Sequence, residues 1–404
     1  MPESAAAVSA PPDVAARPAR RLRVLMVLES DFLPKGGGGA ESQLRTVALH
    51  LQRTGQRVAV VTPLLARGPQ RTAERSLGIP VGRIRYPRLP GIGGAVMCLR
   101  FAMFLLGRGR RYDAWHVHIG HHMGAIACLI GSLIGKPVVV KISGWWELEQ
   151  GVMSPSAKPL ARLARRWLKR ASTVQAISTR IAGELGRHGF PAERVLVLPN
   201  AVDTSRFRVR TALRAPGAPF TAVFVGRLVP EKGLSTLLDA WAQAFAGRSD
   251  VRLRLVGGGP QEPALRAQAE RLSIAGQVEF LGHRDRVEEV LAEADVGLLT
   301  SRIEGLSNTL LEFMASGLPT VASRVSGSED FVVPGQNGWL FSVGDTAGLA
   351  SALREAQALP PDRLAALGQK ARADVEAKAS LPTVVGRLIA LYQGSAPRAL
   401  ERAG

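Results

Sequence analysis

Two glutamates bracket the start of a predicted helix in the second half of the chain. They are Glu304 and Glu312, which stand eight positions apart in the stretch SRIEGLSNTLLEFMASGLPTVAS. A carboxylate near a helix start can simply complement the helix dipole, which is worth about 0.3 to 1 kcal/mol. It can also accept hydrogen bonds from the hydroxyl groups of a ligand. For either glutamate taken alone, both interpretations stay open.

The helix start itself predicts an anion site. If the helix begins near Asn308, the free backbone N–H groups of Asn308, Thr309 and Leu310 point out of its N-terminus and attract an anion. Side chains in the first turns lean toward the N-terminus, so Glu312 could reach a ribose diol there. Glu304 would lie on the other side of a bound diphosphate. This layout fits a nucleotide sugar.

A pair of cations is expected to meet the same diphosphate. Arg227 and Lys232 stand five positions apart in the loop that follows the predicted strand PFTAVFV. In open α/β sheets, ligands bind outside the carboxyl ends of the strands. Arginine can chelate two phosphate oxygens, and lysine can act as a point charge. A solvated surface loop is the alternative, which the position at a strand exit disfavours. Glycines, including Gly226 and Gly257, gather at the same strand exits.

The elements that must position these residues follow a repeated order. RLRVLMVLES is a continuous apolar run typical of a parallel strand, and a glycine loop, an amphipathic helix and a second strand follow it. The same order restarts near residue 200. We therefore predict an α/β protein with two Rossmann-like, doubly wound domains that face each other across a cleft. The expected divisions are a disordered tail over 1–21, a first domain over 22–203, a second domain over 204–380, and a C-terminal helix over 381–404. The family resemblance given below implies that the first domain binds the acceptor, that the second binds the nucleotide sugar, and that the C-terminal helix packs back on the first domain.

Composition excludes several classes of protein. A chain of 404 residues with 46% hydrophobic and 21% charged residues is a globular chain too long for a single core. The two cysteines, Cys98 and Cys128, have no CxxC partner, which predicts buried thiols in a reducing compartment. The N-terminus does not resemble a secretory signal. The most apolar stretch, GIGGAVMCLRFAMFLLG, contains Arg100 and is too short to span a membrane, so we expect a buried or interfacial helix.

The charge is concentrated in the first half of the chain. Residues 1–200 carry 29 lysines and arginines against 11 acidic residues, a balance of +18 out of a total of +19. Such a domain suits nucleic acid, a membrane surface or a phosphorylated substrate. The low aromatic content, 5%, and the lack of a recognition module disfavour nucleic acid.

One segment of this half indicates a membrane surface. KPLARLARRWLKRAS places basic and apolar residues on separate stripes, as in an interfacial helix, although a plain surface helix has the same spacing. The basic stripe consists of Arg162, Arg165, Arg166, Lys169 and Arg170. We expect a cytoplasmic protein, with peripheral attachment to the inner face of the plasma membrane if the helix is interfacial.

Several motifs together resemble those of the family 4 glycosyltransferases. VGRLVPEKG, LVGGGP, FLGHRDRVEEVLAEADVGLLTS and EGLSNTLLEFMASGLPTVAS look like the second-domain signature, with Glu304 and Glu312 filling the E-x7-E motif. GGAES, HVHIG and VLPNAVDTSRF are similar to first-domain and junction elements. The resemblance covers about residues 22 to 395. It implies a GT-B fold and retaining transfer of a sugar from a nucleotide diphosphate donor to an acceptor hydroxyl, in cell-envelope polysaccharide or glycolipid synthesis. It implies no cofactor and no required metal.

The resemblance also implies residue roles. Arg227 and Lys232 would bind the diphosphate and stabilise the leaving group, Glu304 would orient donor sugar hydroxyls, and His118 would lie near the donor sugar. The implied donor-binding set comprises Gly38, Gly39, Gly226, Gly257, His283, Arg284, Gly305, Leu306, Ser307, Asn308, Thr309 and Glu312. A GT-B epimerase or phosphorylase is an alternative, which the intact E-x7-E motif and the missing cofactor-lysine segment disfavour.

The sequence departs from the family pattern in the first domain. The glycine run GGGGA is longer than the usual pair, which leaves its ligand contacts open. KISGWWELEQG matches a variant of the family. An acceptor could be held there by Lys141, Ser143, Gly144, Trp145 and Trp146, although the two tryptophans could equally anchor the loop on the core.

The histidines around His118 do not predict a metal site. His116, His121 and His122 lie close to it in the sequence, but His116 and His118 alternate on a strand. No carboxylate completes a ligand set at suitable spacing. We therefore expect no metal.

Overall fold

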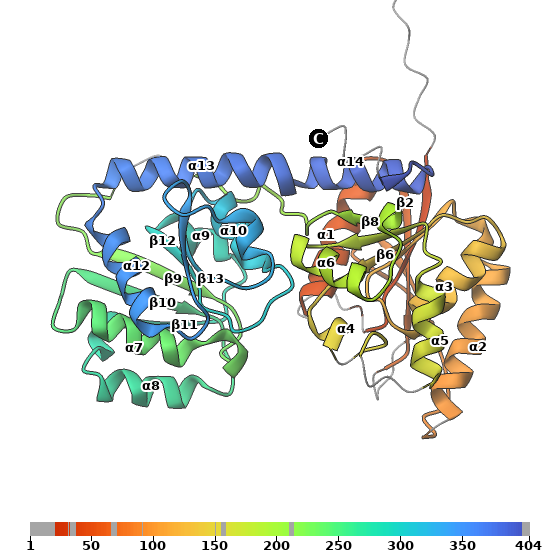
Figure 1. The fold of residues 1–404 in the computed structure, drawn as a ribbon, viewed down its shortest axis with the longest axis horizontal. Coiled ribbons are helices and arrows are strands. Elements are labelled where there is room, and N and C mark those ends of the chain that lie inside the picture. Colours follow the sequence, from red (N-terminus) through yellow and green to blue (C-terminus); the bar gives the residue numbers. More distant parts are fainter. Residues whose placement is uncertain are drawn as a thin grey trace, which may run out of the picture.

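The computed structural model describes residues 21–30, 32, 38–65, 71–90, 92–149, 151–154, 159–209 and 214–397. The predicted tail, apart from Arg21, and part of the glycine run lie outside these residues. The described chain forms two α/β domains side by side (Figure 1). The predicted fold class is confirmed.

The first domain is built on an eight-stranded sheet with the order β3-β4-β2-β1-β5-β6-β7-β8. All neighbours pair in parallel except β3 and β4, which form an antiparallel hairpin. Its strands are β1 (Arg23–Val27), β2 (Arg57–Pro63), β3 (Ala73–Ser76), β4 (Ile79–Ile84), β5 (Ala114–Val117), β6 (Val138–Ile142), β7 (Thr173–Ala176) and β8 (Val195–Val197). Its longer helices are α1 (Gly39–Arg53), α2 (Ile92–Gly107), α3 (His122–Leu133), α5 (Pro159–Leu168) and α6 (Thr179–Arg187), and α4 (Trp146–Glu149) is a single turn.

Strand β1 shows why the sequence forms this sheet. Leu25 and Val27 join one hydrophobic cluster, whereas Val24 and Met26 join another. The strand is therefore buried on both faces, as expected for a parallel strand covered by helices on each side. Because β1 is flanked by β2 and β5, the chain reverses its strand order there, and the carboxyl ends of β1 and β5 border the crevice where ligands bind in such sheets.

The second domain is built on a six-stranded parallel sheet with the order β11-β10-β9-β12-β13-β14. Its strands are β9 (Phe220–Val225), β10 (Val251–Val256), β11 (Val278–Gly282), β12 (Val296–Leu299), β13 (Thr320–Ser323) and β14 (Gly338–Phe341). Its helices are α7 (Leu234–Phe245), α8 (Glu262–Arg271), α9 (Val287–Ala292), α10 (Asn308–Ala315), α11 (Ser328–Phe331), α12 (Thr346–Ala358) and α13 (Pro361–Ala379). Its strand order reverses between β9 and β12, which places the loops after these two strands side by side.

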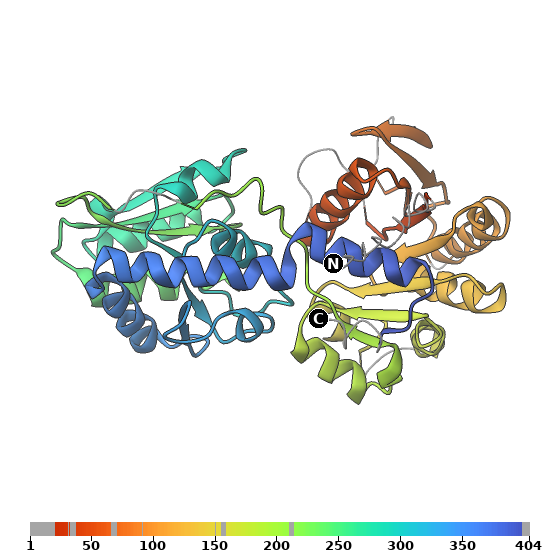
Figure 2. The same ribbon diagram turned by 90° about the horizontal axis from the view of Figure 1, so that it is seen from above.

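Helices α13 and α14 (Leu381–Tyr392) run along one side of both domains (Figures 1 and 2). α13 packs against α10, and α14 packs against α1. Leu381 donates its backbone N–H to the carbonyl of Val202, 3.0 Å away, and Tyr392 Oη lies 2.6 Å from His116 Nδ1. The chain thus leaves the second domain and completes the hydrophobic core of the first.

No helix in the described part of the chain is both long enough and apolar enough to cross a membrane.

Candidate active site

A cavity of about 680 Å³ lies between the two domains, at the carboxyl ends of both sheets. Its size is typical of a small-molecule site. It brings together sixteen of the residues singled out from the sequence, and these are Gly38, Gly39, Lys141, Ser143, Gly144, Trp145, Trp146, Gly226, Arg227, Lys232, Glu304, Gly305, Leu306, Ser307, Asn308 and Thr309.

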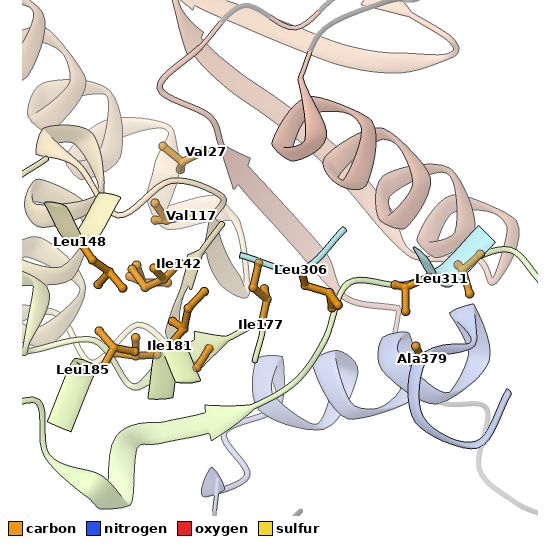
Figure 3. Close-up of a cluster of buried hydrophobic side chains, with 14 of the residues drawn as sticks. Val27, Val117, Ile142, Leu148, Ile177, Ile181, Leu185, Leu306, Leu311 and Ala379 are labelled. Atoms are coloured by element: carbon orange, nitrogen blue, oxygen red, sulfur yellow. The ribbon is translucent and has the colours of Figure 1, made fainter. Parts of the chain in front are cut away.

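The contact between the domains beside this cavity is apolar. Leu306 reaches from the loop after β12 into the hydrophobic cluster that contains Ile177 and Ile181 of the first domain (Figure 3). Gly305 precedes it, and a Cβ atom added there would lie 3.0 Å from the Cα of Gly144. The loop that carries Glu304 is therefore packed directly on the first domain.

The predicted cation and the predicted acid touch each other. Lys232 Nζ lies 2.5 Å from Glu304 Oε1, and Ser301 Oγ lies 2.8 Å from the same oxygen. Arg227, in the same loop as Lys232, is exposed, and no ion pair or hydrogen bond of its side chain is found among the described residues. Lys232 and Glu304 therefore form an ion pair within the lining of the cavity.

The predicted helix start is confirmed at α10, with one correction. Ser307 is the N-cap residue, and its hydroxyl accepts a hydrogen bond from the backbone N–H of Leu310, 3.4 Å away. Leu310 is therefore not free to bind an anion, and the N–H groups of Asn308 and Thr309 remain for that role. A serine at this position satisfies a donor that the helix itself cannot pair.

Asn308 is fixed from the other domain. Its Oδ1 accepts hydrogen bonds from Asn200 Nδ2 at 2.8 Å and Gln43 Nε2 at 3.1 Å. Gln43 also pairs with the backbone of Ala201 through both atoms of its amide, each at 2.9 Å. From the sequence, Asn200 was noted only as part of the motif VLPNAVDTSRF, and Gln43 was not identified as a site residue. Neither side chain could be recognised as a partner of Asn308, because the contact forms only when the two domains meet.

Glu147 orders the first-domain side of the cavity. Its carboxylate accepts hydrogen bonds from the backbone N–H groups of Gly120 at 2.7 Å and Ser143 at 2.6 Å, and so holds the loops after β5 and β6 together. Burial raises the pKa of Glu147 to about 7, against the effect of these N–H groups. Burial also lowers the pKa of Lys141 to about 7, while nearby Glu147 acts to raise it. The sequence analysis did not identify Glu147, whose role depends on these contacts.

The two tryptophans differ in their surroundings. Trp145 Nε1 donates to Glu149 Oε1 at 2.6 Å, and the guanidinium of Arg180 lies 5.4 Å from the centre of the Trp145 ring. Trp145 also packs against the core of the first domain. Trp146 is 47% exposed. Trp145 is therefore anchored, and Trp146 presents the freer ring.

His118 does not line the cavity. Its ring is buried, 4.2 Å from the ring of His116, and both of its ring nitrogens lack a hydrogen-bond partner among the described residues. Burial first, and then His116 and Lys141, lower the pKa of His118 well below its usual value. The side chain is therefore a buried, neutral imidazole that does not line the cavity in this structure.

Four further predicted residues also lie outside the cavity lining, and these are Gly257, His283, Arg284 and Glu312. Gly257 has φ of +124°, and a Cβ atom there would lie 1.9 Å from the carbonyl oxygen of Gly226. The absence of a side chain at Gly257 therefore allows the loops after β9 and β10 to pack closely. His283 and Arg284 are exposed. Burial raises the pKa of Glu312 to about 7, with Arg206 acting to lower it and Glu288 to raise it.

The cavity also contains acids that the sequence analysis missed. Glu29 and Ser30 follow β1, and Glu41 lies in the first turn of α1. Ser30 Oγ donates a hydrogen bond to Glu41. The sequence could have indicated these acids, since polar residues at the end of the first strand lie at the same edge of the sheet as the other site residues.

The fold and the cavity define a two-domain α/β protein with a ligand site at the facing edges of its sheets. Residues 38–201 match the glycosyl transferase 4-like domain, and residues 219–358 match the glycosyl transferases group 1 domain. The chain belongs to the family 4 glycosyltransferases.

Several bacterial proteins are similar to this chain in sequence. A protein of Salmonella typhimurium assigned to colanic acid biosynthesis as the glycosyltransferase WcaL is 33% identical over 56% of this chain and 57% of its own length. The alignment thus spans little more than half of that relative. A GDP-mannose-dependent alpha-mannosyltransferase of Mycolicibacterium smegmatis is 29% identical over 80% of this chain and 85% of its own.

Solved structures share the fold. Anabaena HepE, crystallised in complex with UDP, has a TM-score of 0.73 at 21% identity over 93% of this chain and all of its own. Sucrose-phosphate synthase of Thermosynechococcus elongatus has a TM-score of 0.74 at 20% identity over 95% of this chain and all of its own. These likenesses establish a GT-B fold.

Proposed function

We propose that this protein is a retaining glycosyltransferase that moves a sugar from a nucleotide diphosphate donor to an acceptor hydroxyl, in the synthesis of a cell-envelope polysaccharide or glycolipid. The observation that carries the proposal is the interdomain cavity, which joins Arg227, Lys232, Glu304 and the N-terminus of α10 at the carboxyl ends of two sheets. The described activities of the relatives support it.

The donor half of the cavity suits a departing diphosphate. Arg227 and the free N–H groups of α10 can bind its oxygens, and Lys232 can leave Glu304 to join them. Glu304 would then be released to accept hydrogen bonds from donor sugar hydroxyls. Preorganised positive charge at the developing anion is commonly the largest single contribution to such catalysis. The chain supplies this charge itself, so no metal ion is required for the transfer.

The donor nucleoside is expected beyond α10. Glu312 would hold the ribose, and the segment that contains His283 and Arg284 would hold the base through main-chain groups. Closure of the two domains would exclude water, which otherwise hydrolyses the donor.

The first domain is expected to hold the acceptor. Trp146 offers an exposed ring on which a sugar can stack, and Lys141, Ser143 and Gly144 line the cavity beside it. His118 does not line this cavity, so the contact with the donor sugar that the family resemblance implies requires its buried ring to become accessible.

A donor screen tests the proposal. The purified chain is incubated with UDP- and GDP-sugars, and release of nucleoside diphosphate is measured without acceptor. We expect slow hydrolysis of one donor and tight binding of the matching nucleoside diphosphate. Absence of both for every donor would contradict the proposal.

We further propose that one face of the first domain attaches to an anionic membrane. α2, α3 and α5 pack together at the end of that domain (Figure 1) and contain no aspartate or glutamate. This helical face, defined by α2, α3 and α5, exposes large apolar side chains. They are Ile92, Leu99, Met103 and Leu106 on α2, Leu133 on α3, and Leu160 and Leu163 on α5. Leu99 is 61% exposed and Leu160 is 66% exposed. Exposed apolar side chains on helices that carry basic but no acidic residues suit a lipid interface.

The basic stripe predicted for α5 needs a correction. Arg162, Arg166 and Arg170 are exposed, but Arg165 donates to the carbonyl of Ser154 at 3.3 Å. Lys169 has its ammonium 5.7 Å from the centre of the Phe190 ring. Two of the five cations therefore contact the protein, because α5 is oriented with Ala164 and Leu168 buried.

Vesicle binding tests this face. Replacing Arg162, Arg166 and Arg170 by Gln should lower binding to phosphatidylglycerol vesicles, because each cation near an anionic surface contributes about 1 kcal/mol. Changing Leu99, Met103 and Leu106 to Ser should lower it further by removing apolar burial. The matched control replaces three exposed arginines of the second domain, Arg271, Arg324 and Arg363. Equal binding of all variants, or no binding by the native chain, would overturn the proposal.

A further inference from the structure

One cluster in the first domain combines two imidazoles and a carboxylate. Glu29 follows β1, whereas His121 and His122 stand at the start of α3, after β5. His121 Nδ1 lies 2.9 Å from Glu29 Oε1 and 3.0 Å from His122 Nδ1, and His122 Nδ1 lies 3.9 Å from the same carboxylate oxygen. The sequence argument against a metal assumed that no carboxylate stood near these histidines. Because β1 and β5 pair in parallel, Glu29, which stands 92 positions before His121 in the sequence, supplies that carboxylate.

The three atoms form a triangle that suits tetrahedral coordination. Zinc binds imidazole nitrogen and carboxylate oxygen at about 2.0 to 2.2 Å, so two ligands of a tetrahedral site lie about 3.3 Å apart. The separations in the cluster, 2.9, 3.0 and 3.9 Å, lie on both sides of this value. Small side-chain rotations would therefore make the triangle regular.

The cluster also has the support and the access that a metal site needs. The second oxygen of Glu29 accepts a hydrogen bond from the backbone N–H of Met123 at 2.7 Å, which orients the carboxylate. The side chains of His121 and His122 are about one-third exposed, so an ion can enter from solvent. Glu29 also lines the interdomain cavity, which places the cluster at the rim of that cavity.

We propose that Glu29, His121 and His122 bind a zinc-class divalent transition metal ion. Two imidazoles with one carboxylate favour zinc and its neighbours over magnesium and calcium, which prefer sets of oxygen ligands. Three protein ligands leave one tetrahedral position for water or for an oxygen atom of a ligand. The ion links the end of β1 to the start of α3. This site is separate from the diphosphate site, and the inference does not rest on the transfer reaction.

Direct metal binding tests the proposal. The full chain, freed of metal by chelation and dialysis, is titrated with zinc in competition with a coloured chelator. We expect one zinc ion to bind tightly per chain, and excess magnesium to leave it in place. His121→Asn and His122→Asn should each weaken binding by about tenfold or more, and Glu29→Gln should weaken it as well.

Two controls make the result decisive. His188 lies 3.6 Å from Glu184 in a pair without a second histidine, so His188→Asn should leave the affinity unchanged. If a histidine variant does not fold, the Glu29→Gln variant and the intense visible absorption of tetrahedral cobalt in the native chain still report on the site. Failure of the native chain to bind zinc, displacement by magnesium, or equal affinity of the native chain and the cluster variants would overturn the inference. Donor turnover plays no part in these measurements.

Discussion

At the scale of single residues, the ion pair between Lys232 and Glu304 carries most of the functional argument. Both side chains are largely shielded, and among the described residues Ser301 is the only other hydrogen-bond partner of the Glu304 carboxylate. Because the cost of desolvating two charges offsets much of their attraction, a shielded pair of this kind is weak evidence of a contribution to folding. The pair instead holds a cation and an acid at the place where a diphosphate and a sugar are proposed to bind.

Lys232→Ala and Glu304→Ala should therefore lower turnover strongly with little change in melting temperature. Loss of one positioned charge at a developing anion is expected to cost about 10²- to 10³-fold in kcat. The matched control is Lys370→Ala, which removes a surface ion pair with Asp374 and should leave turnover intact. Steady-state kinetics and thermal melts check the prediction. Near-normal turnover in either active-site variant would show that the pair has been assigned the wrong role.

Glu312 allows a test by pH. Burial raises its pKa to about 7, so the side chain is neutral below that pH and is a carboxylate above it. Only the carboxylate can accept hydrogen bonds from both ribose hydroxyls through all its lone pairs. The measured quantity is the donor affinity of the native chain divided by the donor affinity of the Glu312→Gln variant. This ratio should therefore rise between pH 6 and pH 8. The ratio cancels other groups that titrate in this range, such as Lys141. A ratio independent of pH would contradict the ribose role.

At the scale of elements, the strand-exit loops and one helix start provide the positive charge of the proposed donor site. Arg227 and Lys232 come from the loop after β9, and the free N–H groups come from α10, which follows β12. The switch in strand order between β9 and β12 places these elements beside each other. Positive charge from the chain can then do what a metal ion does in other donor sites.

Donor turnover is accordingly expected to survive EDTA. The chelator would also strip zinc from the cluster of Glu29, His121 and His122, so retained turnover would show that the two sites are separate in function. The assay compares hydrolysis rates before and after chelation and after addition of magnesium or manganese. Complete loss that either ion restores would place a metal in the reaction.

At the scale of the whole molecule, function depends on how the two domains meet. The polar network of Gln43, Asn200 and Asn308 and the apolar contact of Leu306 join them beside the cavity. Helices α13 and α14 cover both domains and fix them from another side (Figure 2). The excess positive charge resides in the first domain, on which the membrane face was proposed.

Gly305→Ala should disturb this contact. The added methyl group would lie 3.0 Å from the Cα of Gly144 and 3.1 Å from Ile177 Cδ1, so the two domains can keep this contact only if the neighbouring atoms shift by a few tenths of an ångström. We expect a several-fold rise in the donor KM with a fall in kcat, because closure assembles the site. Gly183→Ala, on the open surface of α6, is the control and should have no such effect. Unchanged kinetics in the Gly305 variant would mean that this contact does not govern closure.

The sequence alone determined the features that depend on local pattern. Apolar runs, glycine loops and amphipathic helices predicted two doubly wound domains, and the start of α10 near Asn308 followed from the residues around it. Arg227, Lys232 and Glu304 were found for the same reason, since a parallel sheet exposes its ligand site at the strand ends. These properties are set within one strand–loop–helix unit.

Only the tertiary structure decided which of these units touch. Gln43 meets Asn308 across 265 positions of sequence, and Glu29 meets His121 across 92. The inward position of the His118 ring and the closed pair of Lys232 and Glu304 likewise depend on neighbours from other units. Periodicity gives the face on which a side chain lies, but not the element packed against that face. The order of strands in the two sheets and the docking of the domains supply that information, because they set the distances on which hydrogen bonds, ion pairs and metal coordination depend.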